Sequence, residues 1–171
     1  MKFTHDRIVT NIQELIAQLE LQPHPEGGYF KETYRSEGVI EGYSEGLFPA
    51  GRNYATGIYF LLEGHDFSAF HRIKSDELWH FYEGGPLHIF DIDAQGRLTV
   101  ITLGRNTTGG EVYQAVVKAG HWFASAPVHS DQFSLVGCTV SPGFDFRDFE
   151  MAGRQQLTMA FPRHAALIKR L

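Results

Sequence analysis

From Gly28 to Val140 the chain is a series of short apolar or alternating runs, each bounded by turn-forming residues. Runs of this length, separated by Gly, Pro, Asn and Asp, are typical of β-strands. They follow one another closely with no helical pattern between them, which excludes a fold built from parallel βαβ units. The sequence therefore predicts an all-β, antiparallel sandwich or barrel of the jelly-roll kind.

We expect roughly eight to ten strands. The predicted strands are residues 28–35, 56–62, 67–73, 77–82, 87–92, 98–103, 112–117, 122–123 and 133–140. In the first of them, strand alternation places Phe30 and Tyr34 on one face and Lys31, Thr33 and Arg35 on the other. Residues 36–53 are rich in glycine and are predicted to form a long surface loop, a kind of segment that is often functional.

Two short helices are expected to bracket the strands. Apolar residues recur at helical spacing near the N-terminus, at Ile12, Leu15, Ile16 and Leu19. They predict a helix at about residues 10–20, with Thr10 as a suitable N-cap. Pro162 introduces a second helix at 163–171. The whole chain, 1–171, is then a single domain with a barrel at about 28–161 between the helices.

Composition narrows the possible partners. The formal net charge of −5 argues against a protein that binds nucleic acid through a basic surface. No apolar stretch is long enough to span a membrane, and the N-terminus lacks the apolar run of a signal peptide. The single cysteine, Cys138, cannot form an internal disulfide, which suits a reducing compartment. We therefore expect a cytoplasmic protein whose partner is a small molecule, with neither nucleic acid nor membrane involved.

The run from residue 70 to 84 contains the side chains best suited to form a functional site. Residues two apart on a strand share a face, so His71 and Ile73 point the same way, as do Glu77, Trp79 and Phe81. Trp79 and Phe81 are strong core formers, so Glu77 is expected to point into the barrel with them. A carboxylate among aromatic rings is costly unless it is paired, hydrogen-bonded or bound to a metal. This run is therefore predicted to contribute the functional site.

The same run resembles the first cupin motif, G-x5-H-x-H-x3-E-x6-G, with His71, Glu77 and Gly84 at matching positions. Three further segments, residues 24–30 (His-Pro-Glu-Gly-Gly-Tyr-Phe), 58–62 and 136–144, resemble the cupin type-5 family of small single-domain cupins. The resemblance covers about residues 11–162. It implies a double-stranded β-helix that usually forms a homodimer, and it brings no established reaction with it.

The chain departs from the cupin pattern at two of the four usual metal ligands. Ile73 stands at the second histidine of the first motif, and Phe123 stands at the histidine of the second motif. Catalytic metal sites normally supply three protein ligands. His121 shares a face with Phe123 and is the candidate substitute, whereas His80 alternates away from Glu77. We expect no bound metal and no cofactor.

The first hypothesis is a cupin that binds a small molecule. As an enzyme it would be a metal-independent isomerase or epimerase that transfers a proton on a carbohydrate-like or carbonyl substrate. His71 is then the base and Glu77 its orienting partner, similar to the metal-free cupins that epimerise nucleotide-linked deoxysugars. Those epimerases have a lysine where Glu77 stands, so a diphosphate substrate is not expected here. The expected ligand contacts are Tyr59, Trp79, Phe81, His121 and Phe123.

Two other hypotheses stay open. One is a metal-dependent oxygenase or isomerase with His71, Glu77 and His121 as ligands. The other is a non-enzymatic binding module, in which His71 is a core histidine satisfied by Glu77 or by backbone, and the aromatic residues only fill the barrel. The segment 24–28 is a turn that either feeds the next strand into a partner subunit or covers the mouth of a pocket. Cys138 is expected to be an inert buried thiol.

Overall fold

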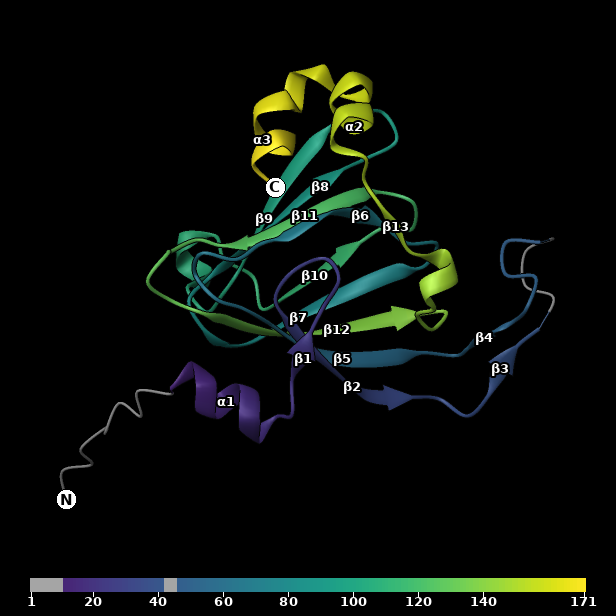
Figure 1. Cartoon of the computed structure of the whole chain (residues 1–171), viewed down its shortest axis with the longest axis horizontal. Helices are drawn as coiled ribbons and strands as arrows, with labels where there is room; N and C mark the ends of the chain where they lie inside the picture. The colour runs from purple at the N-terminus through teal and green to yellow at the C-terminus, as the bar shows by residue number, and fades with distance from the viewer. Residues whose placement is uncertain (1–10, 42–45) are drawn as a thin grey trace.

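Two antiparallel sheets face each other in the computed structural model, which describes residues 11–41 and 46–171 (Figure 1). The first sheet has the strand order β1 (Gln22–Pro23), β2 (Tyr29–Arg35), β5 (Thr56–Leu62), β12 (Ser134–Ser141), β7 (Asp76–Gly84) and β10 (Gln114–Val117). The second has the order β13 (Glu150–Met151), β6 (Ser68–Arg72), β11 (Trp122–Pro127), β8 (Leu87–Ile92) and β9 (Leu98–Leu103). The predicted all-β, antiparallel jelly roll with short terminal helices is confirmed.

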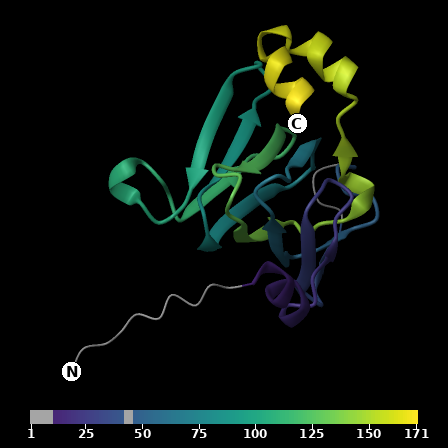
Figure 2. The same cartoon turned by 60° about the vertical axis from the view of Figure 1, so that its left-hand side comes forward.

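Helices cover part of the outer face of each sheet. Helix α1 (Ile12–Gln18) packs on the first sheet, and α2 (Arg154–Ala160) and α3 (Ala165–Arg170) pack on the second (Figure 2). Leu15 of α1 contacts the cluster of Leu61 and Leu135, while Phe60 points into the core between the sheets. Strands buried on both faces need apolar residues at consecutive positions, which explains the continuous run from Phe60 to Leu62.

Several predicted boundaries match and others need correction. The strands predicted at 56–62, 87–92 and 98–103 are found with those limits. The N-terminal helix is shorter than 10–20 and is capped by Asn11, whose side chain accepts a hydrogen bond from the backbone of Gln13 at 3.0 Å. The predicted cap, Thr10, lies outside the described residues.

The C-terminal region holds two α-helices where the sequence predicted one at 163–171. Helix α2 buries only Leu157 of its seven residues, so it carries too little apolar periodicity to be recognised from the sequence. A 3₁₀ turn, η3 (Pro162–His164), joins it to α3. The long loop at 36–53 contains a small hairpin of β3 (Val39–Ile40) and β4 (Arg52–Asn53).

A β-bulge in β2 changes which side chains face the interior. The pairing of β2 with β5 shifts between Glu32 and Tyr34, so that Arg35 lies opposite Thr56 and Glu32 opposite Ile58. The bulge adds one residue to the strand, and every side chain beyond it changes face. The predicted alternation is therefore wrong from Tyr34 onward: Arg35 shares a face with Phe30 and Glu32, and Tyr34 is exposed.

A buried ion pair fixes the hairpin of β3 and β4 against the segment after β12. Arg52 in β4 donates from Nε to Asp148 Oδ2 at 2.5 Å and from Nη2 to Oδ1 at 2.8 Å. Asp148 ends a 3₁₀ turn, η2 (Phe146–Asp148). Both side chains are 5% exposed. The pair therefore holds in place the segment that carries Phe144, Phe146 and Phe149.

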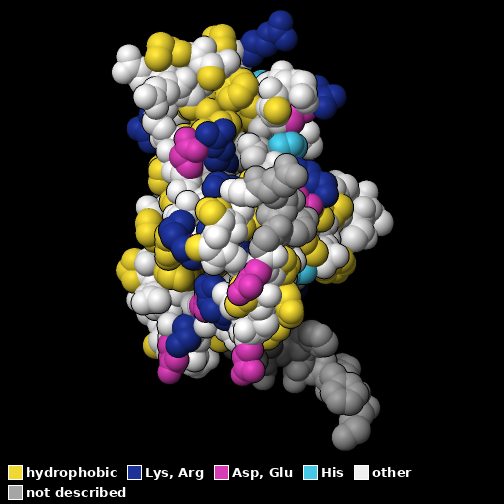
Figure 3. Space-filling model, turned by 90° about the vertical axis from the view of Figure 1, so that its right-hand side faces the viewer, with side chains coloured by type: hydrophobic (Ala, Val, Ile, Leu, Met, Phe, Trp, Pro, Cys, Tyr) yellow, Lys and Arg dark blue, Asp and Glu magenta, His cyan; other side chains and the backbone are white. Residues whose placement is uncertain are grey.

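Charged side chains of both signs are mixed on the molecular surface. On the face shown in Figure 3, Lys and Arg side chains are interspersed with Asp and Glu side chains. Within the described ranges, no helix has both the length and the apolar content needed to cross a membrane.

Replacing Asp148 by Ala is expected to destabilise the protein by about 3 to 5 kcal/mol, because the Arg52 guanidinium is left buried without its partner. The double variant Arg52→Met/Asp148→Leu removes both charges and is expected to stay within about 2 kcal/mol of the wild type. Urea unfolding followed by tryptophan fluorescence measures both. Equal losses in the single and the double variant would contradict the role of the ion pair.

Candidate functional site

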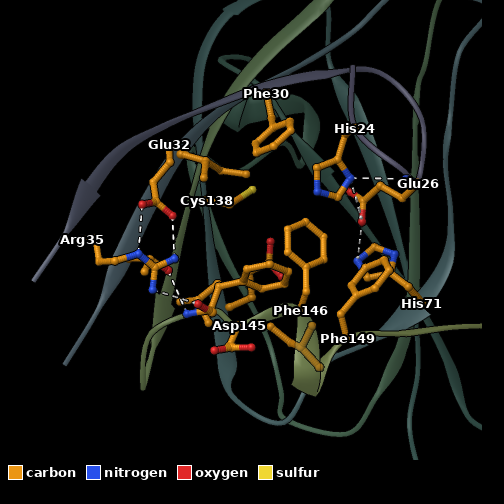
Figure 4. Close-up of a pocket in the computed structure, with 16 residues that line it drawn as sticks. His24, Glu26, Phe30, Glu32, Arg35, His71, Cys138, Asp145, Phe146 and Phe149 are labelled. Atoms are coloured by element: carbon orange, nitrogen blue, oxygen red, sulfur yellow. Dashed lines mark hydrogen bonds and ion pairs between the residues drawn. The ribbon is translucent and has the colours of Figure 1, made fainter. Parts of the chain in front are cut away.

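A cavity of about 290 Å³ lies at one end of the barrel, between the two sheets. This volume is at the lower end of the range for small-molecule sites. Its apolar wall consists of Phe30, Ile58, Ile73, Val140, Phe144, Phe146 and Phe149. Its polar and ionisable lining consists of His24, Glu26, Glu32, Arg35, Thr56, His71, Glu77, Cys138 and Asp145. The side chains labelled in Figure 4 come from the loop before β2, from β2, β6 and β12, and from the segment after β12, and β5 and β7 complete the lining.

His71 lies at the floor of the cavity with both ring nitrogens engaged. Nδ1 is 2.7 Å from the carbonyl oxygen of Ala69, and Nε2 is 3.1 Å from Oε2 of Glu26. A carbonyl only accepts hydrogen bonds, so Nδ1 carries a proton. A single proton is then shared between Nε2 and the Glu26 carboxyl group. The backbone N–H of Ala69 also donates to the Glu26 carbonyl at 2.9 Å, so that one residue of β6 fixes both partners.

Burial decides where the shared proton lies. Burial raises the pKa of Glu26 to about 8 and lowers the pKa of His71, although the charge of Glu77 and the bond to Ala69 oppose the shift of His71. At neutral pH the carboxyl group of Glu26 is therefore protonated and donates to a neutral imidazole. The pair stores one proton at the cavity floor without carrying a net charge.

Glu77 is the second carboxyl group of the floor. Burial raises its pKa to about 7; the charge of His71 opposes this shift and the charge of Glu26 adds to it. The thiol of Cys138 in β12 donates a hydrogen bond to Glu77, and burial keeps the pKa of that thiol well above its usual value. Glu77 is thus a half-ionised carboxyl group near neutral pH, next to a thiol that stays protonated.

His24 lies on the loop between β1 and β2 and is held as a neutral donor. The backbone N–H of Glu26 donates to Nδ1 of His24 at 3.3 Å, so the ring proton is on Nε2. Burial and the charge of His71 lower the pKa of His24 to about 4. In Figure 4 the second ring nitrogen points into the cavity. The site therefore offers an N–H donor opposite Cys138 and Phe146.

The charges at the mouth of the cavity are paired with one another. Arg35 donates from Nε to Glu32 Oε1 at 3.0 Å and from Nη2 to Oε2 at 2.7 Å. Its Nη1 donates to Asn53 Oδ1 at 2.9 Å and to the Phe144 carbonyl at 3.1 Å. The bulge in β2 makes the Arg35–Glu32 pair possible, because residues three apart on a regular strand face opposite ways.

The residues predicted for the site divide into two groups. His71 and Glu77 both line the cavity, and Ile73 lines it with them as expected from its face. The five predicted ligand contacts lie elsewhere: Tyr59, Trp79, Phe81, His121 and Phe123 are absent from its lining. The predicted partner of His71 also changes, because Glu26 and not Glu77 lies at its ring nitrogen.

The reasons for these corrections differ from residue to residue. Trp79 and Phe81 do point inward, but they lie further along β7 than Glu77 and fill the core. Tyr59 alternates with Ile58 to the outer face, 5.9 Å from the ring of Tyr82. Phe123 is buried in the core, with its ring centroid 4.1 Å from that of His71.

His121 is engaged outside the cavity and the remaining donors do not fit a metal ion. Its Nδ1 is 2.9 Å from Asp91 Oδ1. In residues 11–41 and 46–171, no group of three or more His, Cys, Asp or Glu side chains is arranged to hold a metal ion. Ile73 and Phe123 offer no donor atoms where the cupin motifs have histidines. The donor set therefore does not match the metal centre that the resemblance to cupins implies.

Sequence reasoning missed His24 and Glu26, although it singled out their segment. The glycines after Glu26 explain how the loop reaches the site. Gly27 has φ +114°, and a Cβ atom there would lie 2.1 Å from the carbonyl oxygen of Phe67. Only glycine allows this approach to β6. The segment 24–28 thus contributes His24 and Glu26 to the lining of the cavity.

Comparisons with known proteins give a consistent result. The sequence model of a family described as "Cupin superfamily (DUF985)" matches residues 13–152. The uncharacterized protein YML079W of Saccharomyces cerevisiae is 33% identical over 149 residues, which cover 81% of this chain and 74% of the yeast protein.

Two solved structures are also similar. Protein SO0799 from Shewanella oneidensis is 40% identical, with a TM-score of 0.86 over 95% of this chain and 97% of the other. A hypothetical protein from Leishmania major is 34% identical, with a TM-score of 0.87 over 95% of this chain and 98% of the other.

The buried carboxyl groups make stability depend on pH. Glu26 and Glu77 have a higher pKa in the folded chain than their ordinary value of 4.5, so folding takes up protons and stability falls as the pH rises toward 8. The lowered pKa of His24 acts in the opposite direction, but only below its ordinary value of 6.5. Between pH 6.5 and 8 we expect a loss of about 1 to 2 kcal/mol.

Thermal unfolding at several pH values measures this loss. Glu26→Gln removes one titrating group and keeps the shape of the protonated carboxyl, so we expect a clearly shallower decline than in the wild type. The double variant Glu26→Gln/Glu77→Gln is expected to show nearly none. A decline in Glu26→Gln as steep as in the wild type would refute the assignment.

Gly27→Ala is expected to destabilise the protein more than Gly110→Ala. Both glycines have positive φ, but nothing lies within 4 Å of the Cβ position at Gly110. Gly110→Ala therefore carries only the backbone strain, about 1 to 2 kcal/mol. Gly27→Ala adds a clash that costs about 1 to 3 kcal/mol more. Chemical denaturation measures both, and equal losses would show that the loop does not need its close approach to β6.

Proposed function

We propose a reaction for this chain, which belongs to the cupin family DUF985: metal-independent transfer of a proton on a small carbonyl compound, as in an isomerase or epimerase. The observation that carries the proposal is the cluster of Glu26, His71 and Glu77 at the floor of an otherwise apolar cavity. A proton-transfer enzyme needs one group that accepts a proton and one that donates it, each with a pKa near the working pH. Glu77 and the Glu26–His71 pair meet this requirement.

Glu77 is the better base of the two groups named from the sequence. Both ring nitrogens of His71 are already engaged, by Ala69 and by Glu26, so His71 has no free lone pair for a substrate. Glu77 has the Cys138 thiol as its hydrogen-bonding partner and a pKa near neutrality. We therefore assign the base to Glu77, while His71 holds the shared proton on Glu26 in place.

The reaction then follows from the positions of three groups. Ionised Glu77 removes a proton from the carbon next to the substrate carbonyl, and the electron pair of that C–H bond forms an enolate. His24 donates its Nε2–H to the enolate oxygen as a neutral imidazole, the role that a lowered pKa suits. Glu26 returns a proton to the same carbon atom from its other face, so that the carbonyl group re-forms and the configuration of that carbon is inverted. Exchange with solvent then restores the proton of Glu26 and removes that of Glu77.

The lining supports a carbonyl substrate over the carbohydrate-like alternative. Four phenylalanine rings and three aliphatic side chains make up the apolar wall, and they offer no partners for a ring of hydroxyl groups. The single cationic side chain of the lining, Arg35, is already paired with Glu32, so a phosphate or diphosphate group finds no free partner. The donor set likewise gives no support to a metal-dependent oxygenase.

Deuterium exchange tests the proposal. A panel of small aldehydes and ketones is incubated with the protein in heavy water, and the loss of the signal of the α-proton is followed by NMR. For any substrate that exchanges, Glu77→Gln is expected to lower the rate by about 100-fold or more. Glu14→Gln, at an exposed position of α1, is the matched control and should keep the rate.

Two results would overturn the assignment. One is an exchange rate that survives Glu77→Gln in a protein whose melting temperature is unchanged. The other is exchange that requires an added divalent metal. Saturable binding of compounds that never exchange their α-protons would favour the non-enzymatic binding module instead.

A further inference from the structure

Aromatic rings from two distant segments of the chain converge on the cavity. Phe144, Phe146 and Phe149 pack edge-to-face with centroid separations of 5.0 to 6.1 Å. Phe30 approaches from β2, with the ring of His24 at 4.6 Å from it and at 6.2 Å from Phe146. Figure 4 shows Phe30, His24 and Phe146 around the same open space. The face of an aromatic ring is electrically negative and attracts cations.

The ionisable side chains of the lining are also predominantly acidic. Four acidic side chains line the cavity, at Glu26, Glu32, Glu77 and Asp145, against the single guanidinium of Arg35. Arg35 pairs with Glu32, and Asp145 pairs with Arg147 at 2.5 Å. Those pairs neutralise the mouth of the cavity. The carboxyl groups of Glu26 and Glu77 on the floor have no Lys or Arg partner among the residues that line the cavity.

We infer that the cavity takes an organic cation of the alkylammonium class, with its charge toward Glu26 and Glu77 and its alkyl groups against Phe30, Phe146 and Phe149. The inference names the substrate class of the same site. The reacting carbonyl group of that substrate rests on the proposed function, whereas the cation site rests on the residues of the lining alone. The substrate is then a small carbonyl compound that carries an ammonium group.

The walls favour an alkylated ammonium over other cations. A primary ammonium has three N–H donors, and the water molecules around a hydrated metal ion have many O–H donors. An apolar wall leaves these donors without acceptors. A quaternary ammonium has no N–H group to satisfy, and its methyl groups fill an aromatic enclosure well. An anion would lie next to carboxyl groups without meeting a free cationic side chain. The hydroxyl groups of a polyol would lie against hydrocarbon side chains. The lining therefore discriminates by charge and by hydration together.

A cation at the floor also changes the protonation of its partners. The pKa of Glu26 and of Glu77 is raised because these groups are buried without a compensating charge. A bound cation supplies that charge and lowers both values, so binding near pH 7 releases a proton to the solvent from Glu77, whose pKa is the lower of the two, while Glu26 retains the proton that it shares with His71. Calorimetry in two buffers of different ionisation enthalpy detects this release.

Choline and its uncharged carbon isostere, 3,3-dimethylbutan-1-ol, are the matched probes, because they have the same shape and differ in charge. Isothermal titration calorimetry of the full chain is expected to show choline binding about tenfold more tightly than the isostere, or better. Phe146→Leu keeps an apolar side chain but removes the ring, and it is expected to weaken choline several-fold with little effect on the isostere. Tyr113→Leu, at an equally exposed ring outside the cavity, is the control.

Three outcomes would overturn the inference: equal affinity for choline and its isostere, no saturable binding of choline or tetramethylammonium at millimolar concentration, or tighter binding of an anion of the same size. The proposed reaction fails separately. Choline-competed binding of ammonium ketones without any deuterium exchange would refute proton transfer and leave the cation site standing. Exchange of neutral ketones that choline does not inhibit would refute the cation site and leave proton transfer standing.

Discussion

The contact between the carboxyl group of Glu26 and the imidazole of His71 is the interaction on which the site depends. The backbone of Ala69 enforces it, since its N–H group binds the Glu26 carbonyl while its own carbonyl binds His71. The side chains of Glu26 and His71, which are costly to bury, are thereby held with Oε2 and Nε2 3.1 Å apart and one proton between them. Placing Glu77 in the same low-dielectric space raises its pKa to about 7 and creates a group suited to proton transfer.

The rest of the molecule offsets the free-energy cost of this polar cavity floor and determines the shape of the cavity around it. Helices on the outer faces of both sheets bury apolar surface beyond that of the barrel core, which offsets the cost of burying carboxyl groups without a Lys or Arg partner. The ion pair of Arg52 and Asp148 holds the segment that carries three aromatic rings of the cavity wall. The bulge in β2 turns Arg35 toward Glu32 and so removes the free positive charge from the mouth.

Much of the fold was predictable because the signals are local. Strand alternation, turn residues and close spacing indicate antiparallel sheets without any knowledge of pairing. The inward direction of Glu77 follows because it shares a face with the core residues Trp79 and Phe81. The sequence did not predict two local features. One is the bulge in β2, which no residue type indicates, and the other is helix α2, which buries only Leu157. Trp79 and Phe81 lie outside the cavity lining because alternation gives the face of a strand, not the depth along it.

The sequence by itself determined the family, the class of fold and two carboxyl or imidazole groups of the site, because those depend on the order and spacing of residues along one strand or motif. Only the tertiary structure decided that Glu26 is the partner of His71 and that His24 presents an N–H group to the cavity. It also decided that Arg35 is neutralised. These contacts join residues that are between three and dozens of positions apart in the sequence. They depend on the path of the loop before β2, on the bulge in β2 and on the backbone hydrogen bonds of Ala69. Their energies depend on burial, which no single segment of sequence contains.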